Sequence, residues 1–140
     1  LFDGDEVLEV NATTASVTID TGNMVTNGRS AWHGKRLTVM RADSTYANSV
    51  TIGGMAVLPG GSITFQLITG HLNGWLAQVE TYRGPTSAIT VAQLPAASAV
   101  PIGTRLVVSD CNTTTYNAAA AGGGSNTVSV YSDLSSWKVG

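Results

Sequence analysis

Residues 62–68 have the sequence SITFQLI, in which polar and apolar side chains alternate from Ser62 to Leu67. Successive side chains of a strand point to opposite faces of a sheet, so this alternation predicts a strand with one buried face. Helical patterns are nearly absent, because the helix-friendly residues 96–100 are enclosed by Pro95 and Pro101, which leaves too little room for a stable helix. We therefore expect an all-β protein. Shorter stretches of the same alternating kind lie at residues 7–10, 16–19, 36–40, 49–52, 75–79 and 127–131.

An internal repeat divides the chain. Residues 34–39, GKRLTV, recur as residues 103–108, GTRLVV. Each copy is followed, at similar spacings, by a tyrosine, a glycine run, an alternating strand and a strand that carries a tryptophan. A hairpin signal, Asn73-Gly74, precedes the first tryptophan strand. The ordered set predicts two similar small antiparallel β-units, sandwich- or barrel-like, at residues 1–82 and 83–140.

The composition excludes several classes of protein. Charged residues make up only 11% of the 140 residues, against about 25% in an ordinary soluble domain, and the net charge is −2. With seven basic residues there is no electrostatic signature of nucleic-acid binding, and no stretch approaches the 18 apolar residues of a membrane span. No signal peptide opens the sequence, and the single cysteine, Cys111, cannot form an internal disulfide. Such low charge suggests that much of the surface is buried against copies of the same chain.

Five stretches of the second unit form a distinctive set, residues 91–97, 103–110, 122–126, 130–133 and 137–140. With these stretches, roughly the last fifty residues resemble a segment common near the ends of bacteriophage and prophage tail fibre and tail-associated proteins. The first unit resembles fibre β-modules over residues 34–79. Because the family segment often ends its parent protein, we expect Gly140 to be a true C-terminus and Leu1 not to be a true start.

The resemblance implies a tail fibre or tailspike module that interlocks as a homotrimer, contacts other virion tail proteins and attaches to a host cell-surface polysaccharide. Such a protein is made in the cytoplasm of the bacterial host and resides in the virion. Two alternatives stay open. The chain could be a purely structural connector or trimerisation clamp of a larger virion protein, or part of a polysaccharide depolymerase.

The residues offer little catalytic chemistry, and we expect no enzyme activity within this chain and no cofactor. Glycoside cleavage needs two facing carboxyl groups, which Glu80, Asp110 and Asp133 could supply, but no pattern indicates that they meet. His33 and His71 stand without the partners of a metal site, and the acidic residues 3–6 fit a solvated turn better than a calcium loop. No catalytic or metal-binding residue is therefore predicted.

Aromatic side chains on loops are the candidates for ligand binding, because exposed rings stack on sugars. Trp32 and His33 precede a predicted strand and have no counterpart in the repeat. Tyr46 and Tyr116 occupy equivalent Asn- and Thr-rich loops of the two units. The alternative for all four is packing against a neighbouring subunit. By contrast, Trp75 and Trp137 follow tight turns at matching points and are expected in the cores.

Overall fold

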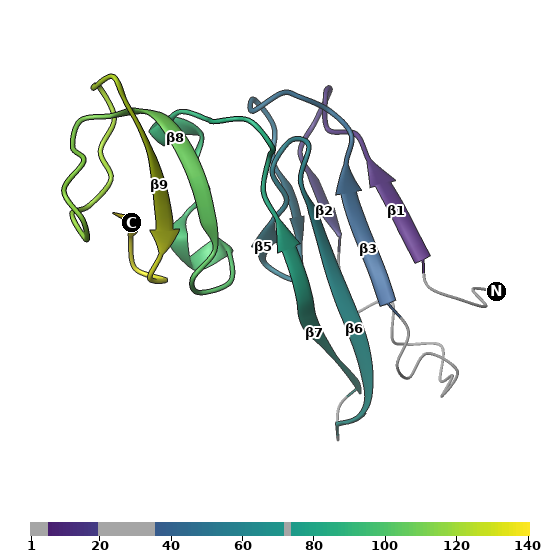
Figure 1. The fold of residues 1–140 in the computed structure, drawn as a ribbon. Helices are drawn as coiled ribbons and strands as arrows, with labels where there is room; N and C mark the ends of the chain where they lie inside the picture. The colour runs from purple at the N-terminus through teal and green to yellow at the C-terminus, as the bar shows by residue number, and fades with distance from the viewer. Residues whose placement is uncertain (1–5, 20–35, 72–73) are drawn as a thin grey trace. The chain divides into compact units, whose positions relative to one another are not determined.

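The computed structural model describes residues 6–19, 36–71 and 74–140. The chain divides into two compact units, Leu1–Arg83 and Gly84–Gly140, one residue from the expected boundary. The described residues form strands joined by loops and two short 3-10 helices, with no α-helix among them, so the all-β prediction is confirmed (Figure 1). Within those residues, no helix has the length and hydropathy needed to cross a lipid bilayer.

Unit 1 contains a four-stranded sheet in the order β1-β3-β6-β7 (Figure 1). The alternating stretch at 62–68 lies in β6, and its side chains alternate between buried and half-buried from Ser62 to Gln66. β6 pairs antiparallel with β7, as the hairpin signal predicts, although Asn73 itself lies outside the described residues. The strands are β1 (Glu6–Val10), β3 (Arg36–Arg41), β6 (Ser62–His71) and β7 (Gly74–Arg83).

A second, three-stranded sheet completes unit 1, with β2 (Val17–Ile19), β4 (Val50–Ile52) and β5 (Met55–Ala56) in the order β2-β4-β5. Here the expectation of antiparallel pairing needs a correction, because β1 pairs with β3, and β2 with β4, in parallel. The reason is that the chain makes the same connection twice. It passes from β1 to β2 and later from β3 to β4, each time from the larger sheet to the smaller one and in the same direction. The two strand–loop–strand arches therefore stack in register.

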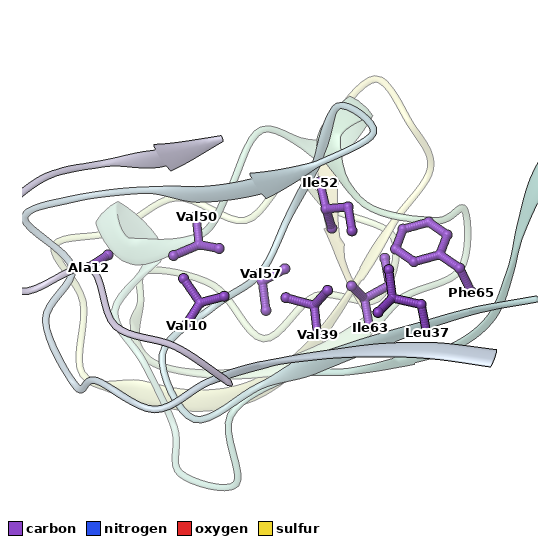
Figure 2. Packing of buried hydrophobic residues seen from close by; sticks show 9 residues of the cluster. All are labelled: Val10, Ala12, Leu37, Val39, Val50, Ile52, Val57, Ile63 and Phe65. Carbon is purple, nitrogen blue, oxygen red and sulfur yellow. The ribbon is translucent and has the colours of Figure 1, made fainter. Parts of the chain in front are cut away.

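Apolar side chains from both sheets meet in one core, so unit 1 is a small sandwich. In Figure 2, Val50 and Ile52 of β4 point toward Val39 and Ile63 of the larger sheet. Val39, Val50, Ile52 and Ile63 have no exposed surface. Burial of such side chains stabilises by about 1.5–3 kcal/mol each. The cluster consists of Val10, Ala12, Leu37, Val39, Val50, Ile52, Val57, Ile63 and Phe65.

Unit 2 is a three-stranded antiparallel sheet in the order β10-β9-β8, preceded by the 3-10 helices η2 (Val91–Gln93) and η3 (Ala97–Ala99). Trp137 is buried on one face of this sheet, where its indole N–H donates to the carbonyl of Pro95 at 2.8 Å. Its predicted core position is confirmed, whereas the side chain of Trp75 lies outside the described residues. The strands are β8 (Arg105–Cys111), β9 (Asn126–Ser132) and β10 (Trp137–Val139).

The two units share part of their strand order. β3-β6-β7 in unit 1 and β8-β9-β10 in unit 2 are both sets of three antiparallel neighbours, and each places the repeated Arg-Leu segment on its first strand. On the outer edge of that strand, β1 runs parallel to β3, and Ile89 forms a parallel bridge to Val108 of β8. The sheet β2-β4-β5 has no counterpart among the strands of unit 2.

Candidate functional site

The structure describes two of the four predicted binding residues, and these two lie in different units. Trp32 and His33 lie outside the described residues. Tyr46 lies in the loop after β3 of unit 1, and Tyr116 lies in the loop after β8 of unit 2. The two tyrosines therefore have to be assessed separately.

Tyr46 belongs to a loop whose backbone is held in place by hydrogen bonds from Arg41. The buried guanidinium donates to the carbonyls of Thr45 at 2.6 Å and Asn48 at 2.9 Å, and it pairs with Asp43 at 2.9 Å. Tyr46 itself is half-buried, and burial raises the pKa of its phenol. These contacts favour a packing role for Tyr46 over stacking on a ligand.

Tyr116 has the opposite character. Its side chain is 77% exposed, more than any other large apolar or aromatic side chain of the described residues. Its loop is nevertheless held in place, because Asn117 donates its backbone N–H to Val139 at 2.7 Å and Ala118 accepts from Val139 at 2.9 Å. An exposed ring on a loop tied to β10 is preorganised for binding, since little conformational freedom remains to be lost.

Beside Tyr116 lies a group of side chains that the sequence did not identify. Arg105 of β8 is opposite Tyr131 of β9, and Tyr131 is opposite Lys138 of β10. Opposed residues of antiparallel strands project from the same face, so these three form a row across the sheet. The alternation in β9 is visible in the sequence, but only the pairing register shows that the row exists.

The backbone of Gly140 connects this row to Tyr116. A Cβ atom placed on Gly140 would lie 2.8 Å from Cε1 of Tyr131 and 3.2 Å from Cε2 of Tyr116, so both rings border this glycine. Arg105 donates from Nη1 to the backbone oxygen of Gly140 at 3.0 Å, and Tyr131 donates its hydroxyl to Oδ1 of Asn117 at 2.7 Å. We call Arg105, Tyr116, Asn117, Tyr131 and Lys138 the tyrosine face.

Two of the three predicted carboxylate candidates, Asp110 and Asp133, have described side chains, and both are bonded to nearby backbone N–H groups. Asp110 accepts from the backbone N–H of Val91 at 2.7 Å. Asp133 accepts from Ser135 and Ser136, and these hydrogen bonds, first that from the Ser135 hydroxyl, lower the pKa of Asp133 to about 2. A general acid needs a raised pKa instead. The side chain of Glu80 lies outside the described residues.

Other chemistry finds little support in the described part of the chain. No three His, Cys, Asp or Glu side chains gather there in a way that could hold a metal ion. Cys111 is buried and free.

Comparison with protein-family models, curated proteins and solved structures gives no match for this chain. Fold and site together define an all-β protein of two units whose most distinctive surface is the tyrosine face.

Proposed function

We propose that this chain is a module of a bacteriophage tail fibre or tailspike that assembles as a homotrimer with other virion tail proteins and attaches to a host-surface glycan. The observation that supports attachment best is Tyr116, an exposed ring on a loop fixed to β10. Sugar rings present apolar C–H faces and polar rims, and an aromatic ring beside amide and hydroxyl groups complements both. Asn117 and the threonines at 113–115 supply such groups around Tyr116.

Self-assembly is supported by the outer face of the larger sheet in unit 1. Val7 is 65% exposed and Met40 is 47% exposed on the face opposite the core. The same face carries uncharged polar side chains, including Thr38 and Thr64, whose hydroxyl oxygens are 3.0 Å apart. Permanent assemblies bury exposed apolar side chains of this kind, although the same face also carries the charged residues Glu9, Arg36 and Arg83.

The same exposed apolar side chains favour a second candidate, a connector or trimerisation clamp without a ligand of its own. A depolymerase role has less support, because the carboxylates of Asp110 and Asp133 are bonded to nearby backbone groups. The two leading candidates differ in what Tyr116 does. It contacts sugar in an attachment module and contacts a partner subunit in a clamp.

A glycan array combined with light scattering distinguishes them. We expect the full chain to elute with three times its 14.4 kDa mass and to bind surface polysaccharides of bacteria. Tyr116→Ala should weaken glycan binding about tenfold without changing the mass. Ile102→Ala, which removes another strongly exposed side chain of unit 2, is the matched control and should leave binding unchanged. A trimer that binds no glycan would favour the clamp, and a monomer that binds none would contradict both proposals.

A further inference from the structure

The negatively charged side chains of unit 2 have hydrogen-bond partners nearby, whereas its positively charged side chains have no Asp or Glu partner in the part of the chain that the structure describes. Residues 84–140 contain four charged side chains: Arg105, Asp110, Asp133 and Lys138. Both carboxylates are bonded to nearby backbone N–H groups, Asp110 to Val91 and Asp133 to Ser135 and Ser136. Within the described residues, neither Arg105 nor Lys138 lies within salt-bridge distance of an Asp or Glu side chain. The unit therefore has two cations that no Asp or Glu side chain of the described residues neutralises, and Arg105 also donates to the oxygen of Gly140.

Both cations lie on the tyrosine face, in one row with an aromatic ring. Arg105 and Lys138 are the cross-strand neighbours of Tyr131 on its two sides. Neighbouring strands are about 4.8 Å apart, so each cation originates one strand away from the ring. The buried face below is apolar, with Leu106, Val130 and Val139 opposed in the adjacent row. A ligand that meets this row thus meets a ring flanked by positive charge.

The guanidinium of Arg105 is oriented but still available. One hydrogen bond, from Nη1 to the backbone oxygen of Gly140, fixes its position, and the side chain is exposed. A guanidinium carries five N–H donors, so enough remain for a carboxylate to accept two in parallel. The phenol of Tyr131 is similarly fixed by Asn117, which leaves the ring held at the centre of the row.

From this arrangement we infer that the tyrosine face binds a sugar that carries a carboxylate directly on its ring, as a uronic acid does, within an anionic polysaccharide. The inference rests on the proposed attachment function and specifies its ligand. The ring of the sugar stacks on Tyr131 or Tyr116, and carboxylates of the polysaccharide pair with both Arg105 and Lys138. Because the cations share a row with the aromatic ring, the anion has to be attached close to the stacked sugar ring rather than on a distant linker.

The test compares the affinity of the chain for an oligogalacturonate with its affinity for the same oligosaccharide after reduction of the carboxyl groups to alcohols. Titrations use the full wild-type chain and three variants of it: Arg105→Gln, Lys138→Gln and Arg83→Gln. Arg83 is an exposed cation of β7 in unit 1 and serves as the matched control. Thermal melts on all of them check that the glutamine variants stay folded.

We expect the acidic form to bind at least about tenfold more tightly than the reduced form, and each of Arg105→Gln and Lys138→Gln to remove about that factor. Arg83→Gln should change affinity less than twofold. Binding should weaken as salt is added, because the cations are close to solvent. An equal loss in the Arg83→Gln variant would indicate diffuse attraction and would overturn the inference.

Other outcomes separate this inference from the proposed function. Equal binding of the acidic and reduced forms would overturn the carboxylate preference but would leave the proposed glycan attachment intact. Binding to neutral array sugars alone would have the same two consequences. Binding of a phosphate-bearing glycan or an acidic peptide in place of the uronate would also overturn it. Absence of binding to every sugar, acidic or neutral, would overturn both.

Discussion

Asp110 accepts a hydrogen bond from the backbone N–H of Val91 at 2.7 Å. Val91 stands two residues after Ile89, which bridges to β8, and Asp110 stands two residues after its bridge partner Val108. Unit 1 contains the same relationship: Asp43 accepts from the N–H of Ala12 at 2.8 Å, and these residues stand two after the paired Arg41 and Val10. In both units a carboxylate, Asp43 just beyond the end of β3 or Asp110 near the end of β8, therefore ties the outer parallel segment to that strand.

Replacing each of these aspartates with alanine should destabilise its unit by different amounts. Asp110→Ala leaves one backbone N–H without its partner, at a cost of about 1–3 kcal/mol. Asp43→Ala also leaves the buried guanidinium of Arg41 without its counter-charge, which costs about 3–5 kcal/mol. Urea denaturation followed by NMR signals of each unit measures both. Equal costs would mean that the Arg41–Asp43 pair contributes nothing beyond the shared hydrogen bond.

Acid should weaken unit 1 over a defined range of pH. Hydrogen bonds from Arg41 lower the pKa of Asp43 from 3.8 to about 2. A carboxyl group with a lower pKa in the folded state stabilises the fold above its unfolded pKa, and this stability is lost as the pH falls through the folded pKa. The free energy of unfolding should therefore decrease between about pH 4 and pH 2. The carbon-13 shift of the Asp43 carboxyl, followed against pH, should titrate near pH 2, and a midpoint near 3.8 would disagree.

Trp137 and Tyr116, two of the aromatic residues of unit 2, should respond oppositely to truncation. Trp137→Ala removes a ring that is 8% exposed and should cost about 3–5 kcal/mol of stability. Tyr116→Ala removes a ring that is 77% exposed and should change stability by no more than about 0.5 kcal/mol. Thermal melts of both variants are the measurement. For Trp32→Ala, which changes a residue outside the described structure, reduced glycan binding with a nearly unchanged melting temperature stays a prediction.

Gly124 should tolerate no side chain. A Cβ atom at this position would lie 2.2 Å from the carbonyl oxygen of Cys111 and 2.5 Å from Cα of Asn112, both backbone atoms. Gly124→Ala should therefore force the loop from β8 apart and cost about 1–3 kcal/mol. Gly122→Ala, whose added Cβ approaches only side chains, is the control and should cost less. Similar melting temperatures for the two variants would contradict this difference.

The sequence predicts where strands occur better than how they pair. Alternation locates β3, β6 and β9, and the Asn-Gly signal locates the β6–β7 hairpin. The parallel stacking of β2 on β4 was missed, although residues 16–19 and 49–52 both have the sequence SVTI and pair identical residues, Val17 with Val50 and Ile19 with Ile52. Identical tetrapeptides that stack in register are the signal that would have indicated it.

The repeat also differs in detail from its sequence pattern. In the sequence repeat, Val39 is the equivalent of Val108. In the structure, Asp43 and Asp110 make equivalent hydrogen bonds two residues after Arg41 and Val108, so Arg41 is the equivalent of Val108 there. A shift of two residues keeps each side chain on its original face, because the period of a strand is two. For the same reason the row of Arg105, Tyr131 and Lys138 depends on pairing register, which local alternation does not determine.

Hydrogen exchange of the full chain, with and without the glycan that binds it best on the array, tests the proposed function most directly. We expect slower exchange at the amides of residues 112–121 and of Tyr131, because the ligand covers the tyrosine face and restricts its loop. Unit 1 should be unchanged apart from any residues that contact other subunits. Protection confined to unit 1, with residues 112–121 exchanging at the same rate in both samples, would contradict glycan attachment through the tyrosine face.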